Sequence, residues 1–205
     1  MYKSDIWGYL IADIQNEYGV AGLMGNLQAE SGLIPYRLQG DFSSGYTTSI
    51  EYTQNVDNGT ISEYDFVHNA PNGGGYGLAQ WTYYTRKQGL YDMKKSKGFD
   101  SIGNVELACT YLLYELKNSY TSVYNTLKNA TTIREASDKV LHDFENPADQ
   151  SESVEILRCE LGTALYNELS GSPPITPDNP DTPIITTKKK KKNFKFVLFK
   201  KRRIY

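Results

Sequence analysis

The sequence has few of the residue types that build metal centres or covalent catalysis. It holds only two cysteines, Cys109 and Cys159, and two histidines, His68 and His142. None of them shows the close spacing of a zinc site, so we expect no metal and no cofactor. Both cysteines fall inside predicted helices rather than at a helix N-terminus, where a thiol ionises more easily. We expect two buried thiols, with a single disulfide as the alternative, and a Cys–His peptidase is disfavoured.

Long apolar runs are also absent. No stretch approaches the roughly 18 apolar residues that a membrane-spanning helix needs. In the N-terminal segment "MYKSDIWGYLIADIQNEYGV", Asp5 and Asp13 interrupt the only apolar stretch. We therefore expect no secretory signal peptide, and any action outside the producing cell needs another release route.

Basic residues are scarce outside the last 18 positions. Residues 188–205 hold 10 of the 22 Lys and Arg residues and no acid, which leaves 12 basic against all 24 acidic side chains in residues 1–187. An acidic body does not attract nucleic acid, so we expect no nucleic-acid partner. Any polyanion would bind the basic end.

Helical periodicity dominates the sequence. Apolar residues at helical spacing predict helices over 5–18, ending at Gly19, and from Val20 to Gly32. Gly22 and Gly25 inside the second helix cost about 1 kcal/mol each relative to alanine, which indicates close packing against a neighbour. Further helices are expected over residues 82–97, 104–118 and 119–129. A capping box at Thr132 and Glu135 predicts a helix through Phe144, and a second capping box at Asp149 and Glu152 predicts a helix that ends near Leu169.

Residues 34–80 depart from this pattern. Short runs such as "IEYTQNV" and "SEYDFVH", separated by Gly, Asn, Asp and Ser, predict a loop-rich lobe with a small hairpin or sheet. The expected fold class is therefore α+β, mostly helical, with a small β lobe beside a helical lobe. Residues 1–169 form this domain, residues 170–187 with five of the eight prolines form an extended linker, and residues 188–205 form a basic tail.

Glu30 stands in an unusual place for a carboxylate. It lies in the last turn of the second predicted helix, on or beside the apolar stripe, just before the glycine that ends the helix. Burial and the negative end of the helix dipole both disfavour the charged form, so we expect a carboxyl group that keeps its proton near neutral pH. A proton held in this way is what a general acid requires.

A glycine-rich stretch, "GGGYGLAQWT" over residues 73–82, accompanies Glu30. Its glycines allow the backbone to approach a ligand, while Tyr76, Gln80 and Trp81 offer aromatic faces and an amide suited to a sugar. It lacks the Lys and Ser or Thr of a phosphate-binding loop.

Four stretches together resemble the phage tail-tip lysozyme group, a branch of the lysozyme-like superfamily: "GLMGNLQAESGLIP", "YTQNVDNG", "GYGLAQWTYYTRKQGL" and "FENPADQS". The resemblance covers residues 4–169 in the expected order and implies a lysozyme-like fold. It implies that Glu30 is the catalytic acid. It also implies that Gly75, Tyr76, Gly77, Gln80 and Trp81 line the sugar cleft, and that Glu145 contacts substrate or has a structural role. Asn146 departs from the arginine usual at that position.

The second catalytic group stays open at this point. Hydrolysis of a β-1,4 glycosidic bond normally uses two carboxyl groups. Asp41 in "QGDFSSG" and Asp57 in "NVDNG" are the candidates, although loop aspartates often bind their own turn. A lytic transglycosylase would use Glu30 alone, first as acid and then as base.

The function that the resemblance implies is a muramidase cleaving the bond between N-acetylmuramic acid and N-acetylglucosamine. We expect a phage endolysin acting on a Gram-positive host, made in the host cytoplasm and reaching the wall by holin-type release or phage delivery. The alternative that is not an enzyme is a non-catalytic tail or wall-binding module. The expected partners are peptidoglycan glycan strands, and the protein is expected to be a monomer.

The basic tail contains an apolar run, "FKFVLF". Lysines flanking aromatic residues suit an anionic surface, which is a membrane or wall teichoic acid in this setting. We expect the tail to hold the enzyme at the bacterial envelope.

Overall fold

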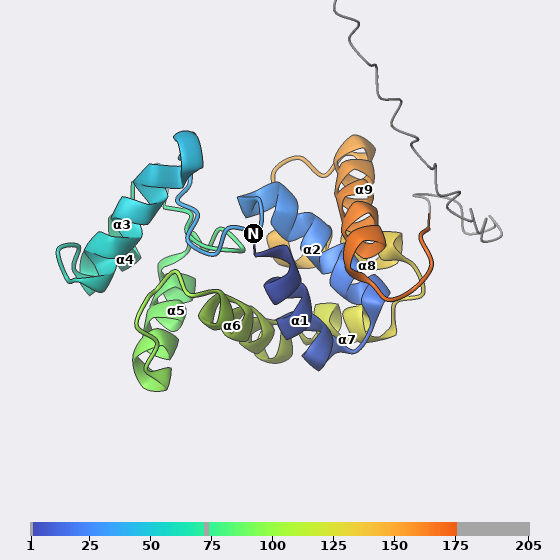
Figure 1. The fold of residues 1–205 in the computed structure, drawn as a ribbon, viewed down its shortest axis with the longest axis horizontal. Helices are drawn as coiled ribbons and strands as arrows, with labels where there is room; N and C mark the ends of the chain where they lie inside the picture. Colours follow the sequence, from blue (N-terminus) through green and yellow to red (C-terminus); the bar gives the residue numbers. More distant parts are fainter. Residues whose placement is uncertain (1, 72–73, 176–205) are drawn as a thin grey trace, which may run out of the picture.

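A computed structural model describes residues 2–71 and 74–175. The chain folds around one buried helix, α2 (Glu17–Ser31) (Figure 1). Residues 19–27 of α2 are all buried. The helices that pack on it are α1 (Lys3–Ile14), α7 (Thr121–Asn129), α8 (Ile133–Val140) and α9 (Glu152–Leu169). Together with α6 (Val105–Asn118), which packs on α1, they form the helical body.

Glycines let α2 approach its neighbours, as the sequence predicted. A Cβ atom on Gly22 would lie 2.6 Å from the Cβ of Ala136 in α8. A Cβ atom on Gly25 would lie 2.3 Å from the carbonyl oxygen of Arg158 in α9. Since real Cβ atoms do not approach backbone this closely, larger residues at these positions would push the helices apart.

The break between α1 and α2 differs from the prediction. Helix α1 ends at Gln15, which has φ +60°, and Asn16 caps α2 by accepting hydrogen bonds from the N–H groups of Tyr18 and Gly19. Gly19 is therefore inside α2 rather than at the end of α1. It packs against α7, where a Cβ atom would meet the carbonyl oxygen of Leu127.

The predicted small β lobe is wrong. The lobe formed by residues 34–97, which we call the small lobe, contains the 3₁₀ turn η1 (Ser44–Tyr46) and the helices α3 (Thr47–Asp57), α4 (Glu63–His68) and α5 (Tyr84–Lys97). Within the described residues, β structure is limited to isolated bridges that Tyr76 forms with Leu38 and Trp81. The described residues are therefore mostly helical and form no sheet.

Hydrophobic spacing explains why the small lobe is helical. In "TSIEYTQNV" the buried residues are Ser49, Tyr52, Thr53 and Val56, which are spaced for one face of a helix rather than for a strand. In "SEYDFVH", Ser62 accepts a hydrogen bond from the N–H of Asp65 and caps α4. The β-branched and aromatic residues of both runs suggested strands because each run is short.

The later helices follow the prediction closely, with two changes. Thr132 caps α8 as expected, but this helix continues as a π-helical turn, η2 (Leu141–Glu145). The residue that caps α9 is Ser151, whereas Asp149 accepts a hydrogen bond from the Ser151 N–H in the connection before the helix.

Helix α9 ends where the linker was expected to begin. The first linker residues fold back on α2, since Ser172 donates a hydrogen bond to Glu17. The remainder of the predicted linker and the whole basic tail lie outside the described residues. None of the described helices is both long and apolar enough to cross a membrane.

Candidate active site

A cleft of about 500 Å³ lies where the end of α2 meets the small lobe. Four segments far apart in the chain line it: the last turn of α2, residues 37–42, residues 79–86, and the end of η2 with Pro147. The lining residues are Ala29, Glu30, Arg37, Gln39, Gly40, Phe42, Ala79, Gln80, Thr82, Tyr83, Arg86, Glu145 and Pro147.

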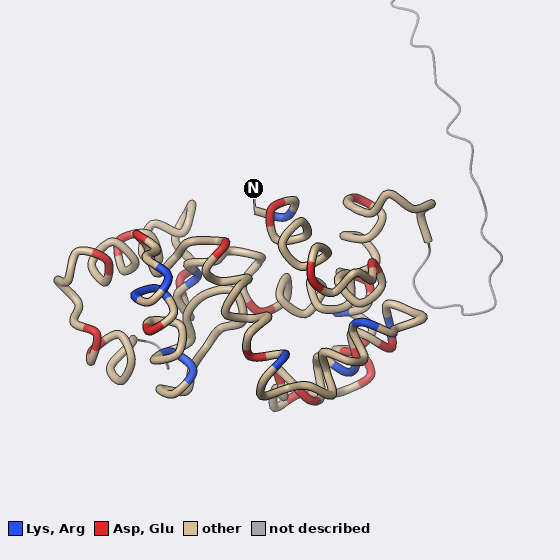
Figure 2. Tube along the Cα trace, turned by 90° about the horizontal axis from the view of Figure 1, so that it is seen from below, with Lys and Arg blue, Asp and Glu red and all other residues tan. Residues whose placement is uncertain are grey.

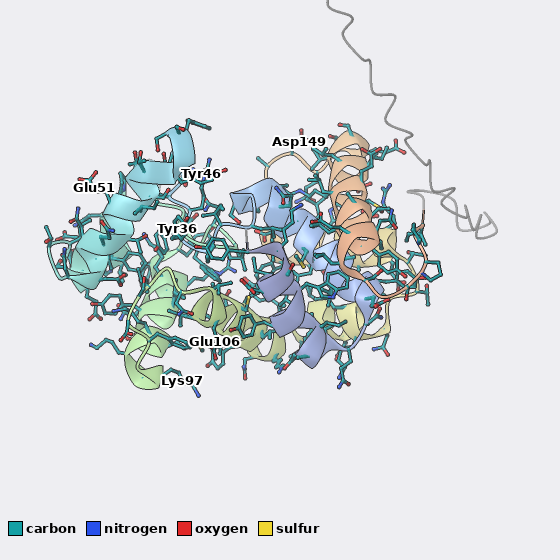
Figure 3. The ribbon with its side chains drawn as sticks, in the orientation of Figure 1. Tyr36, Tyr46, Glu51, Lys97, Glu106 and Asp149 are labelled. Carbon is teal, nitrogen blue, oxygen red and sulfur yellow. The ribbon has the colours of Figure 1, made fainter. Side chains whose placement is uncertain are left out.

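Side-chain directions around the small lobe agree with this placement. Figure 3 shows Tyr46 at the start of α3, on the side that faces α2, and Glu51 on the opposite side of α3. The guanidinium of Arg37 lies 4.3 Å from the centre of the Tyr46 ring. This cation–π contact holds Arg37 at the cleft.

Glu30 lies at the end of α2, as predicted, and it lines the cleft with about a quarter of its side chain exposed. Gly32 ends the helix with φ +66°. The structure adds a cation that the sequence prediction did not include: Arg158 Nη2 donates a hydrogen bond of 2.5 Å to Glu30 Oε1. This pair joins the end of α2 to α9 at the cleft wall.

Buried polar groups fix Arg158 in position. Its Nη1 donates to the side-chain oxygen of Asn26 at 3.0 Å, and the Asn26 amide in turn donates to the carbonyl oxygens of Gly22 and Ser137. Asn26 and Arg158 are both buried. The carboxylate of Glu30 is therefore oriented by a network that joins α2, α8 and α9.

Glu145 is the other carboxyl group that lines the cleft among the described residues. Its Oε1 atom is shielded from solvent and has no hydrogen-bond partner. Burial raises the pKa of Glu145 to about 8, with a further contribution from the negative charge of Glu30, while the charges of Arg86 and Arg158 oppose this rise. A neutral carboxyl group thus lies near Glu30.

Asp41 does not line the cleft. It is 3% exposed, and its carboxylate accepts hydrogen bonds from the backbone N–H groups of Ser43 at 2.9 Å and Ser49 at 2.7 Å, and from both serine hydroxyls. Burial alone would raise the pKa of Asp41, but these hydrogen bonds lower it well below its usual range. The carboxylate ties the loop to α3, so its candidacy as the second catalytic group is corrected to a structural role.

Asp57 is also outside the cleft. It is the last residue of α3, where it accepts a hydrogen bond of 2.7 Å from the backbone N–H of Ile102 and lies 3.5 Å from Lys94 Nζ. These contacts connect α3 to α5 and to the loop before α6. We therefore assign Asp57 a structural role in place of the predicted role as the second catalytic group.

The glycine-rich loop supports the cleft wall through its backbone. The N–H of Gly75 donates to the Gln39 side chain at 2.9 Å, and the N–H of Gly77 donates to the carbonyl oxygen of Arg37 at 2.8 Å. Gln80 lines the cleft, and its amide donates to the carbonyl oxygens of Arg37 and Gly77. Its backbone φ of +43° is unusual for a residue other than glycine.

Tyr76 and Trp81 belong to the core instead of the cleft surface. Both are 0% exposed. The hydroxyl of Tyr76 lies 2.7 Å from Thr53 Oγ1, and Trp81 Nε1 donates to Glu115 at 2.6 Å. Their rings are not available to a sugar, so the sequence-based assignment of both as sugar contacts is corrected to positioning of the glycine-rich loop.

The structure supplies other aromatic residues at the cleft, which the sequence analysis missed. Phe42 is 90% exposed and Tyr83 is 73% exposed, and both are lining residues. Phe42 is the only apolar residue of the polar stretch "QGDFSSG", which is a signal that could have identified it. Arg158 also has such a signal, because it is a charged residue on the buried face of α9, as Glu30 is in α2.

Neither cysteine takes part in the site. Cys109 in α6 and Cys159 in α9 are both buried in the core. Burial raises the pKa of the Cys109 thiol to about 12, so this sulfur is not poised to act as a nucleophile.

Two carboxyl groups in one cleft, between a helical body and a smaller lobe, form an arrangement typical of glycoside hydrolases. The sequence profile of the phage tail lysozyme family matches residues 2–167, so the chain belongs to this family. Membership indicates a lysozyme-like peptidoglycan hydrolase. No curated protein matches the chain significantly.

Proposed function

We propose that the protein is a muramidase that cleaves the β-1,4 bond between N-acetylmuramic acid and N-acetylglucosamine, with Glu30 as the general acid. The observation that carries the proposal is the position of Glu30 in the wall of a cleft of about 500 Å³, in a chain of the phage tail lysozyme family. Glu30 delivers a proton to the glycosidic oxygen, and a water molecule attacks the sugar carbon.

The cleft offers groups for holding a glycan strand. Exposed aromatic rings stack on the apolar faces of sugars, and Phe42 and Tyr83 are placed at the cleft for this role. The side chain of Arg37 has no acidic partner among the ion pairs of the described residues. A cation at this point suits the carboxyl group that N-acetylmuramic acid carries on its lactyl ether.

The roles proposed for the glycine-rich loop are narrower than the sequence suggested. Gly75, Gly77 and Gln80 shape the wall, and Gln80 retains a position from which it can contact a sugar hydroxyl. A side chain at Gly77 would collide with the ring of Trp81, at 2.8 Å. Close backbone packing therefore requires glycine at this point of the wall.

Hydrolysis is favoured over transglycosylation by the second carboxyl group in the cleft, Glu145. A transglycosylase would need only Glu30, which would first donate its proton and then accept one from the 6-hydroxyl of the sugar. If the protein is not an enzyme, the alternative is a non-catalytic wall-binding module.

The biological setting that we propose is lysis of a Gram-positive host by a phage. The family description refers to phage tails, so action from the virion during entry is the alternative to release at the end of infection. The proposed partners are peptidoglycan glycan strands and, for the tail, an anionic envelope surface.

Analysis of the cleaved ends tests the proposal. Purified peptidoglycan is digested and the products are examined by mass spectrometry. New reducing N-acetylmuramic acid ends are expected. Ends carrying a 1,6-anhydro sugar would identify a transglycosylase, and released stem peptides would contradict a glycosidase.

A further inference from the structure

Glu145 occupies an irregular segment of backbone. It is the last residue of the π-helical turn η2, and the Asn146 N–H completes this turn by donating to the carbonyl oxygen of Leu141 at 2.8 Å. Asn146 then adopts a left-handed conformation, with φ +44° and ψ +53°. π-helical turns and left-handed non-glycine residues occur often at functional sites, and here they bring Glu145 to the cleft wall.

The surroundings of Glu145 disfavour a charged carboxylate. Its Oε1 atom is buried without a partner. The nearby cations are already engaged, because Arg86 donates two hydrogen bonds to Glu115 and Arg158 binds Glu30 and Asn26. A second full negative charge beside Glu30 would therefore lack compensation.

Glu30, unlike Glu145, has a cation as its direct hydrogen-bond partner. Arg158 donates directly to its Oε1 atom and is itself held by Asn26. Glu145, whose Oε1 atom is buried without a partner, is the group that keeps a proton in the resting protein.

We propose that Glu145 supplies the proton that Glu30 delivers to the substrate. This inference rests on the proposed glycosidase function. Glu145 is a positioning residue that acts through Glu30, and the reaction leaves the pair unchanged. The proton passes from Glu145 to Glu30 and from there to the glycosidic oxygen, which takes the electron pair of the breaking bond. Water then bonds to the sugar carbon, and the proton that it loses returns to the pair.

The pH dependence of kcat/KM on peptidoglycan tests the inference. Glu145→Gln keeps the shape of the side chain but cannot supply a proton, so Glu30 beside Arg158 has to bind its own. We expect the alkaline limb of the profile to move to lower pH by about two units, which is about a tenfold loss at pH 7 and less than a threefold loss near pH 5. Glu152→Gln, an exposed change in the first turn of α9, is the matched control.

Two outcomes of this experiment would overturn the inference. An equal loss of kcat/KM at every pH would mean that Glu145 has only a structural role. An unchanged pH profile with full activity would mean that Glu145 has no role in the reaction. Circular dichroism melting of each variant shows that it is folded at the pH of the assay.

A titration that needs no activity separates this inference from the proposed function. Carbon-13 NMR of labelled glutamate should show one carboxyl group that titrates well above the ordinary glutamate range and is missing in Glu145→Gln. In Glu30→Gln this titration should move to lower pH, because the neighbouring negative charge is gone. If no such carboxyl group exists, the inference is wrong even when glycan is cleaved. If it exists but glycan is not cleaved, the proposed function is wrong.

Discussion

Arg158 is the cation that pairs with Glu30 at the cleft. The sequence placed Glu30 correctly at the end of a buried helix, and burial together with the helix dipole gave a reason for a retained proton. The pairing with Arg158, 128 positions later in the chain, could not be read from local sequence. A contact of this kind depends on how α2 and α9 pack, so the sequence identified the residue but not its electrostatic surroundings.

Phe42 and Tyr83 are expected to bind the glycan strand. A stacked ring contributes about 1 kcal/mol, so Phe42→Ala and Tyr83→Ala should each raise KM by about fivefold with a smaller change in kcat. Kinetics on peptidoglycan fragments measure this. Tyr114→Ala, an exposed tyrosine of α6 that does not line the cleft, is the control. Unchanged KM in both cleft variants would contradict the assignment.

Asp41 is expected to stabilise the fold. In Asp41→Asn, an amide group would face the N–H donors of Ser43 and Ser49, so we expect a loss of about 2 kcal/mol at pH 7. The folded-state pKa of Asp41 is lowered, so its contribution is fully present above the unfolded value near 4 and is lost as the pH falls further. Urea unfolding at pH 7 and below pH 4 measures the difference between the two proteins. A difference that is constant with pH would contradict this role.

At the scale of elements, close packing of α2 on α9 is the feature that positions Glu30. Gly25→Ala should destabilise the protein by about 1–3 kcal/mol, because its Cβ atom would collide with the backbone of Arg158 and Gly162. The displaced Arg158 should also lower activity. Thermal unfolding and peptidoglycan digestion measure both effects.

Gly8→Ala is the matched control for this prediction. Gly8 lies inside α1 with nothing within 4 Å of its Cβ position, so alanine should stabilise the protein by up to about 1 kcal/mol. If both substitutions had the same effect on stability, close packing would not be the reason for Gly25.

Most helices of the body could be predicted because their signals are local. Gly32 as the end of α2 and Thr132 as the cap of α8 are confirmed, and α6 begins within one residue of its predicted start. The helices of the small lobe could not be predicted, because they are short and their stability depends on packing against the rest of the chain. The π-helical turn η2 had no sequence signal, since the pattern predicted one continuous helix through Phe144.

At the scale of the whole molecule, the cleft joins segments around residues 30, 40, 80 and 145, and a one-dimensional pattern cannot show which side chains of these segments face it. Resemblance to a family supplied that association for Glu30, Gln80 and Glu145, but it also included the buried Tyr76 and Trp81. Acidic positions are spread over both halves of the molecule in Figure 2. This distribution agrees with a body that is acidic overall.

The basic tail is expected to attach the acidic body to the bacterial envelope. Removing residues 188–205 eliminates 10 basic side chains, so binding to whole cells at low salt should fall by at least about tenfold. Added salt should weaken binding of the full chain and leave the truncated chain nearly unaffected. Cell sedimentation assays measure this, with activity on soluble glycan fragments as the control. Unchanged binding after truncation would contradict the role.

Glu30 is proposed to donate the proton that breaks the glycosidic bond. The most direct measurement compares the release of reducing ends from purified peptidoglycan by the wild type and by Glu30→Gln, with Glu152→Gln as the control. We expect a loss of at least about 100-fold in Glu30→Gln, with the fold and peptidoglycan binding retained. Release within threefold of the wild-type rate by a folded Glu30→Gln protein would contradict it.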